Sequence, residues 1–231
     1  LDLEIRLVYV QATSLGTEIS SNDTKVVRVV NGNIDTIGSE IAIGDEFFYL
    51  IGTDNNKAVL LAKYNLYAGG IYDGTRWNEY GEDATGIQNS SMLGYTSAGL
   101  PYKGGIAFSF NIYWLQQVNE YPSYVYNSNS LLYPFIENYK TYLSGSGVVI
   151  EEARLIKLEE LVELGCSISN TNCSSSNYPW VYSASYWTGT AYDHDDVWRV
   201  VSNGGFGYDY NYGNIYDHSI RPVIEVPLTE F

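Results

Sequence analysis

The sequence predicts an α+β fold, in which two helices pack beside antiparallel sheets and a short β-rich extension precedes them. Two segments have apolar residues at helical spacing, and several short apolar segments bounded by turn residues are typical of strands. The chain has 231 residues, 45% of them hydrophobic and 17% charged, which is the composition of a globular, core-forming protein. We therefore expect an extension or stalk over residues 1–40 and one main domain over residues 41–231.

The strands are predicted from alternation and from turn residues. Residues 1–9 alternate apolar and other side chains with a period of two, and valines at 26–30 precede an Asn31-Gly32 turn. Apolar segments at 47–51 and 58–62 flank the turn residues 54–56. Residues 69–105 are expected to form a long surface loop. Near the C-terminus, 197–201 and 220–226 are the clearest strands, and we expect 220–226 to pair near 47–51 and close the domain.

The two helices are predicted from leucine and aromatic spacing. In the first, apolar residues recur at intervals of four, three and four, with a proline in the first turn and Gly145 just past the end; the residues are Leu132, Ile136, Tyr139 and Leu143. In the second, Leu158, Leu161 and Leu164 share one face. Lys157 precedes this helix and is a poor capping residue.

The net charge and the cysteines limit the partners and the cellular compartments that are possible for this protein. The net charge of −15 repels phosphate backbones, so we expect no nucleic acid partner. No run of apolar residues is long enough for a transmembrane helix, and the chain begins with Leu1, so we expect an anchor outside the residues given. Cys166 and Cys173 either form one disulfide, contributing roughly 2.5 kcal/mol in an oxidising compartment, or stay reduced as small core residues.

Catalytic motifs are absent from the sequence. It contains no HExxH, GxSxG or Walker A pattern, and its two histidines are His194 and His218. Asp193, Asp195 and Asp196 form the best candidate for a metal site, with calcium as the cation, but they lack the spacing of an EF-hand loop. We therefore predict that the protein is not an enzyme, has no catalytic residue and needs no cofactor.

A segment near the C-terminus is rich in aromatic and short polar residues. Tyrosine offers a large rigid contact area with a hydroxyl group, and Asn and Asp add adaptable hydrogen bonding, as in recognition surfaces. The alternation Tyr208, Tyr210, Tyr212 places tyrosines on one face of an extended segment, which either faces outward or packs on the core. The predicted ligand-binding residues are Tyr192, Asp193, His194, Asp195, Phe206, Tyr208, Tyr210, Asn211, Tyr212, Asn214, Tyr216, Asp217 and His218.

Several short motifs occur in a fixed order: Arg154-Leu155-Ile156, Glu159-Glu160, Leu164-Gly165-Cys166, Tyr186-Trp187-Thr188, Val197-Trp198-Arg199-Val200 and Ile220-Arg221-Pro222-Val223-Ile224. Together they resemble a family of bacterial surface and secreted domains with a C-type-lectin-like fold, over about residues 43–228. That fold is shared with the variable proteins of diversity-generating retroelements and, more remotely, with formylglycine-generating enzymes. The resemblance implies that Trp187 and Trp198 belong to the scaffold. Arg221 is flanked by apolar residues on its predicted strand and is therefore expected to need a carboxylate partner.

The resemblance implies an extracellular or cell-surface, adhesin-type or receptor-type domain that binds a protein or glycan through a diversified C-terminal face. The chain lacks the Glu-Pro-Asn and Gln-Pro-Asp motifs of calcium-dependent sugar lectins, and it lacks a downstream cysteine pair of the enzyme branch. Two alternatives stay open. One is a pilin-like structural subunit whose tyrosine face contacts another chain, and the other is an enzyme of the formylglycine-generating type.

Overall fold

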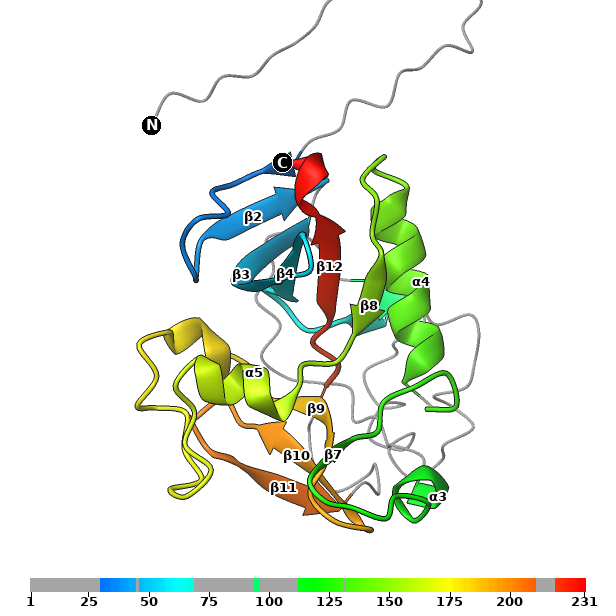
Figure 1. The fold of residues 1–231 in the computed structure, drawn as a ribbon, viewed down its shortest axis with the longest axis vertical. Helices are drawn as coiled ribbons and strands as arrows, with labels where there is room; N and C mark the ends of the chain where they lie inside the picture. Colours follow the sequence, from blue (N-terminus) through cyan, green and yellow to red (C-terminus); the bar gives the residue numbers. More distant parts are fainter. Residues whose placement is uncertain (1–29, 45, 69–93, 96–111, 131, 211–218) are drawn as a thin grey trace, which may run out of the picture.

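A computed structural model describes residues 30–44, 46–68, 94–95, 112–130, 132–210 and 219–231. It is an α+β structure with antiparallel sheets, as the sequence predicts (Figure 1). The strands predicted in residues 1–29 and most of the predicted loop 69–105 lie outside the described residues. Helices α3, α4 and α5 span Ile112–Leu115, Tyr133–Ser144 and Leu158–Glu163, and two 3₁₀ helices span Pro179–Tyr182 and Leu228–Glu230.

The strands of the described residues form three antiparallel sheets. The large sheet has the order β1-β2-β3-β4-β12-β8, with β1 Val30–Asn31, β2 Glu40–Ile43, β3 Glu46–Asp54, β4 Lys57–Ala62, β12 Val223–Pro227 and β8 Glu152–Arg154. The small sheet has the order β11-β10-β9-β7, with β11 Phe206–Tyr210, β10 Asp196–Val200, β9 Tyr186–Ala191 and β7 Ser123–Tyr124. A third pairs β5 Tyr67–Ala68 with β6 Gly94–Tyr95.

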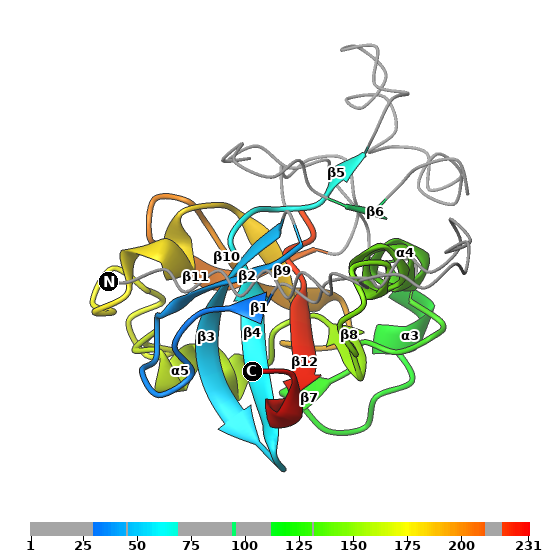
Figure 2. The same ribbon diagram turned by 90° about the horizontal axis from the view of Figure 1, so that it is seen from above.

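Strand β4 is buried on both faces, which explains its uninterrupted apolar sequence over residues 58–62. Along β4, Leu60 and Ala62 join one hydrophobic cluster, while Val59 and Leu61 join the other. Successive side chains of a strand point to opposite faces, so the two clusters lie on opposite sides of the sheet. Helix α4 covers one side and α5 covers the other (Figure 2), and side chains of the small sheet join both clusters.

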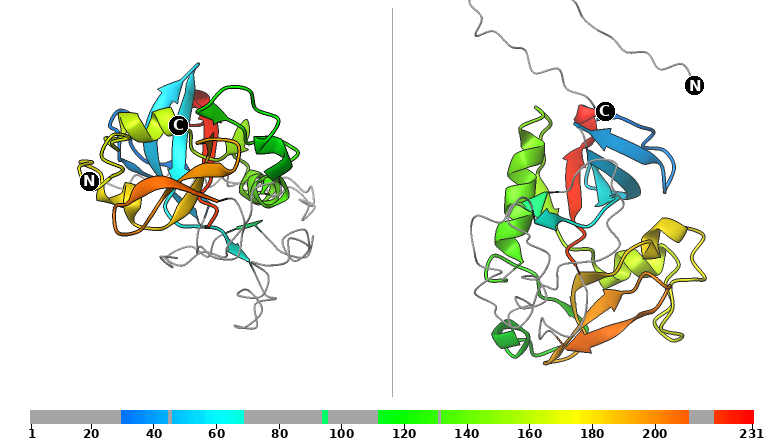
Figure 3. Two further views of the ribbon diagram at one scale, coloured as in Figure 1. Left: turned by 90° about the horizontal axis from the view of Figure 1, so that it is seen from below. Right: turned by 180° about the vertical axis from the view of Figure 1, so that it is seen from behind.

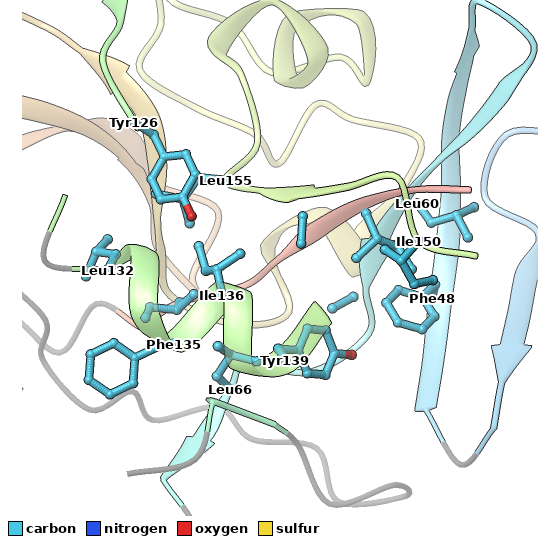
Figure 4. Packing of buried hydrophobic residues seen from close by; sticks show 14 of the residues in the cluster. Phe48, Leu60, Leu66, Tyr126, Leu132, Phe135, Ile136, Tyr139, Ile150 and Leu155 are labelled. Atoms are coloured by element: carbon cyan, nitrogen blue, oxygen red, sulfur yellow. The ribbon is translucent and has the colours of Figure 1, made fainter. Parts of the chain in front are cut away.

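Helix α4 packs its predicted apolar stripe onto the large sheet. Figure 4 shows Ile136 and Tyr139 pointing from the helix toward residues of the sheet such as Leu60 and Phe48. The two residues are fully buried, as the spacing of four and three predicts. The observed limits, Tyr133–Ser144, confirm the helix predicted over 132–143.

Helix α5 begins without help from its N-cap side chain. The backbone N–H of Lys157 instead donates to Glu160 Oε2 at 2.8 Å, and the N–H of Leu158 donates to Thr190 Oγ1 on β9 at 3.1 Å. The first-turn N–H groups of a helix need acceptors, and here one comes from a strand of the small sheet. Lys157 is a poor cap, as predicted, and a tertiary contact replaces the missing local one.

Two expectations about the ends of the chain are corrected. Strand β1 pairs with β2 inside the large sheet, and Ile34 and Ile37 pack against the core, so residues 30–40 belong to the main fold and not to a separate extension. Strand β12 does pair within the sheet that contains 47–51, but its neighbours are β4 and β8, and β3 lies one strand further away. Sheet order depends on long-range contacts, which residue patterns along the chain do not encode.

Two buried arginines hold the elements together in different ways. Arg154, with a side chain 2% exposed, donates from Nε to Glu225 Oε1 at 3.0 Å and makes two bonds to Glu160. Arg221 is fully buried, and its printed partners are the backbone oxygens of Ala62, Lys63, Trp180 and Val181, with the Tyr186 ring 5.1 Å away. Among the described residues it has no carboxylate partner, so that prediction is wrong: carbonyl dipoles satisfy the guanidinium instead.

Candidate functional site

The candidate site lies on the hairpin formed by β10 and β11, at the outer edge of the small sheet (Figures 1 and 3). The register pairs Trp198 with Tyr208 and Val200 with Phe206, so these four side chains share one face. Toward the turn that joins the two strands, this face is core, and toward the other end it reaches the surface. The site is therefore the end of a strand pair whose inner part is buried.

Four aromatic rings build this end of the hairpin. Tyr192 and Tyr208 stack almost parallel, with centroids 3.6 Å apart and an interplanar angle of 6°. Trp198 stands edge-on to both, at 5.4 Å from Tyr192 and 6.0 Å from Tyr208, and its other side contacts Phe206 at 5.0 Å. Offset and perpendicular ring pairs each add roughly 0.5–1.5 kcal/mol beyond area burial. The tyrosine pair is thus held by the core beneath it.

The aromatic residues of β11 on the face of Tyr208 differ in how far they are exposed. Phe206 is 1% exposed and packs in the second hydrophobic cluster, so it belongs to the core and not to an exposed surface, contrary to the prediction. Tyr208, two residues along the same face, is 43% exposed. Position along the strand decides this difference, because the core ends between the two residues. Tyr210 ends β11 opposite Asp196.

The remaining predicted residues of the C-terminal face lie outside the described residues. They are Asn211, Tyr212, Asn214, Tyr216, Asp217 and His218. The scaffold assignment of the two tryptophans is consistent with their burial, since Trp187 and Trp198 are 1% and 4% exposed.

The acidic turn between β9 and β10 lies beside Tyr192. Asp193 Oδ1 accepts hydrogen bonds from the backbone N–H groups of Asp195 and Asp196, at 2.9 and 3.0 Å. His194 contacts Asp195 at 3.0 Å and is 65% exposed in its side chain. Burial, together with the nearby charges of Asp193 and Asp209, raises the pKa of Asp196. Within the described parts of the chain, no three His, Cys, Asp or Glu residues are arranged to hold a metal ion.

The opposite face of the hairpin carries an ion pair. Arg199 Nε donates to Asp209 Oδ2 at 2.7 Å, across the β10–β11 ladder. This pair neutralises Asp209 on that face, away from the stacked tyrosines, because Arg199 and Asp209 alternate with Trp198 and Tyr208. Among the described residues, the carboxylates of Asp193 and Asp196 have no such ion pair with an arginine or a lysine.

A disulfide supports the other side of β11. Cys166 and Cys173 are bonded to each other, which decides between the two states that the sequence left open. The loop they close reaches the hairpin, since Thr171 O accepts from the Phe206 N–H at 2.9 Å and Gly204 O accepts from the Cys173 N–H at 2.8 Å. The loop thus fixes the end of β11 nearest the hairpin turn.

One pocket lies outside the hairpin region. A pocket of about 360 Å³ lies between the turn after β2 and the C-terminal end of α4, lined by Ile43, Gly44, Tyr142, Leu143, Gly145 and Ser146. In Figure 1 the elements that line this pocket, the end of β2 and the C-terminal end of α4, lie at the opposite end of the molecule from β11. Over the stretches that the structure describes, no helix combines the length and apolar character needed to cross a membrane.

Comparison with known proteins adds no relative: no family model, no curated protein and no solved structure matches the chain. The protein is thus characterised by its α+β architecture, its disulfide and the exposed aromatic end of its small sheet. The sequence pointed to the tyrosines of this end through their composition. It suggested Asp196 only as a candidate metal ligand and Trp198 only as a scaffold residue, because their proximity to Tyr208 comes from strand register.

Proposed function

We propose that the protein is an extracellular ligand-binding domain of the adhesin or receptor type, built on a C-type-lectin-like scaffold. The observation that supports this most directly is the stacked pair Tyr192 and Tyr208, which is exposed on one side and held by buried rings on the other. A rigid, partly exposed tyrosine loses little conformational freedom on binding, so its contact area contributes efficiently to affinity.

Two further features support the proposal. The return of β12 between β4 and β8 joins the end of the chain to the main sheet, as expected for a closed module that presents a surface away from its ends. The Cys166–Cys173 disulfide agrees with an oxidising, extracellular compartment. In this proposal the acidic turn 193–196 and the β10–β11 hairpin form the binding face.

The test compares two tyrosines of equal exposure. Tyr208 on β11 is 43% exposed and stacks on Tyr192, while Tyr142 on α4 is 42% exposed and stacks on Tyr139 with a 23° interplanar angle. The chain is screened against a glycan array and a panel of cell-surface proteins, as wild type, Tyr208→Ala and Tyr142→Ala. We expect the hits of the wild type to persist with Tyr142→Ala and to weaken at least tenfold with Tyr208→Ala.

Thermal unfolding of each variant accompanies the screen, and Tyr208→Leu keeps apolar volume if the alanine variant loses stability. A ligand that binds all variants equally, or that is lost equally with both alanine variants, would overturn the proposal for this face.

A further inference from the structure

The tyrosine end of the hairpin leaves two polar atoms without partners. Asp196 and Trp198 are two residues apart on β10, so their side chains share a face with Tyr208. Asp196 Oδ1, an acceptor, and Trp198 Nε1, a donor, are both buried and have no hydrogen-bond partner among the residues that the structure describes. Trp198 is 4% exposed, and its ring contacts both tyrosines of the stacked pair. An unpaired buried polar group costs about 1–3 kcal/mol, so a ligand donor that reaches Asp196 Oδ1 recovers the cost at that atom.

The charge of this end is also uncompensated. Among the described residues no lysine or arginine forms an ion pair with Asp193 or Asp196, whereas Asp209 pairs with Arg199 on the other face. His194 is the basic side chain of the turn 193–196, and its Nε2 lies 3.0 Å from Asp195 Oδ2. A cation beside Asp196 would therefore be attracted by two carboxylates next to an aromatic surface, a combination that favours guanidinium and ammonium groups.

The backbone of β11 gives the shape of the ligand. β11 is the outermost strand of the small sheet. Val201 N–H bonds to Gly205 O across the hairpin, and Phe206 N–H points the other way, to Thr171 O. Backbone groups alternate along a strand, so the N–H and C=O of Tyr208 face the same outer edge as those of Phe206. The disulfide loop covers this edge at Phe206, and no described strand covers it at Tyr208.

We propose that the open edge of β11 at Tyr208 binds an extended, basic peptide segment of a partner protein, which adds to the small sheet as a further strand and places an arginine beside Asp196. This rests on the proposed function and names its ligand class. Strand addition supplies affinity through main-chain hydrogen bonds, and side-chain sites supply specificity. Two strand spacings separate the added strand from β10, about 10 Å. An arginine side chain that crosses the face of Tyr208 can span that separation, together with the reach of the Asp196 carboxylate.

The experiment measures binding of defined peptides to the whole chain by calorimetry. The probe is a blocked heptapeptide of alternating threonine and arginine, which directs all arginines to one face of a strand. Three matched peptides accompany it: one with citrulline for arginine, one with glutamate for arginine, and one with N-methylated backbone at alternate residues. We expect the arginine peptide to bind and each of the others to bind at least tenfold more weakly. Raising the salt from 50 to 500 mM should also weaken the arginine peptide severalfold.

Matched protein variants locate the contact. Asp196→Asn keeps the shape of the side chain and removes its charge, and we expect about tenfold weaker binding of the arginine peptide. Asp35→Asn removes one charge from an exposed position between β1 and β2 and should leave the affinity unchanged. Thermal unfolding of both variants checks that the fold is retained, and slower hydrogen exchange of the Tyr208 N–H in the presence of peptide reports strand addition.

Equal binding of the arginine and citrulline peptides, or equal effects of Asp196→Asn and Asp35→Asn, would overturn the inference. Self-association through this edge in the absence of peptide would overturn it too, in favour of a second copy as the occupant. A glycan ligand that is lost with Tyr208→Ala but unaffected by Asp196→Asn would refute the basic peptide and leave the proposed function standing. Ligand binding that is unaffected by both Tyr208→Ala and Asp196→Asn would refute the basic peptide and the proposed function together.

Discussion

Replacing Gly189 with alanine tests how the small sheet is attached to the rest of the molecule. Gly189 lies in β9, where its N–H donates to Ile156 O at 2.8 Å and its carbonyl accepts from Val125 at 2.8 Å. A Cβ at this position would lie 2.2 Å from Cε2 and 2.8 Å from Cζ of the Tyr124 ring. Real side chains do not approach this closely, so the ring must move.

The cost follows from what the Tyr124 ring would lose. Its hydroxyl donates to Leu155 O at 3.0 Å, and the ring packs against the first hydrophobic cluster. Forcing an extra methyl group into a packed site costs typically 1–3 kcal/mol, and a lost hydrogen bond costs about 1 kcal/mol more. We therefore expect Gly189→Ala to lower the free energy of unfolding by about 2–4 kcal/mol. The assay is urea denaturation at 25 °C followed by tryptophan fluorescence, with the slope checked for two-state behaviour.

Gly207→Ala is the matched control. Gly207 also lies within a strand of the small sheet, but a Cβ there would meet no atom within 4 Å. We expect its free energy of unfolding to stay within about 0.5 kcal/mol of the wild type or to rise slightly, because glycine is a poor strand residue. The double variant Gly189→Ala/Tyr124→Leu should recover part of the loss. Equal stabilities of the two alanine variants would refute the reasoning, since they differ only in the space around the added carbon.

Three further predictions concern stability. Burial tends to raise the pKa of Glu225, but hydrogen bonds from Lys57 and Arg154 outweigh this effect and hold the pKa below its usual range. The Glu225 carboxylate therefore stabilises the fold above about pH 4.5, and this contribution is lost as the pH falls through its pKa in the folded protein. Glu225→Gln should therefore be less stable than the wild type at pH 7, with the difference shrinking in denaturation curves toward pH 3. Replacing both cysteines with serine should cost roughly 2.5 kcal/mol in urea denaturation, with little effect on helix content by circular dichroism. Thr171 has φ +46°, a backbone conformation that is strained for a β-branched residue and tolerated by asparagine. Thr171→Asn should therefore raise the free energy of unfolding by about 0.5–1 kcal/mol, while the carbonyl of residue 171 still accepts the hydrogen bond from Phe206 N–H. An unchanged or lower melting temperature would contradict this prediction.

The residue patterns along the chain predict several helices and strands of this fold. The spacing that ends in Leu143 predicts α4 to within one residue at each end, because one stripe of a helix is buried and the others are not. The apolar run 58–62 marks β4 for a different reason, since both of its faces are buried. These signals depend on neighbours within one or two turns of chain.

Other features depended on residues far apart in sequence and could not be predicted. A run of apolar neighbours around Arg221 suggests a buried charge, but only the fold brings four carbonyl groups to it and no described carboxylate. The sequence around the start of α5 contains no good capping residue, and the acceptor for the Leu158 N–H is Thr190 Oγ1 on β9. Phe206 has the same sequence surroundings as Tyr208, yet one is in the core and the other at the surface, because the hydrophobic cluster ends between them.

The position of the candidate site follows from how β11 is held. Near the hairpin turn, the disulfide loop bonds to Phe206 and fixes that half of the strand. Toward Tyr208, the described residues that support the strand lie on one side of it: β10 and the rings of Trp198 and Tyr192. A strand that is fixed at one end and open at the other holds its backbone in a defined geometry, and its backbone groups at the open end can still bond to a partner. A partner that binds there pays little to order the site, so the contacts it makes with Tyr208 and Asp196 count almost fully toward affinity.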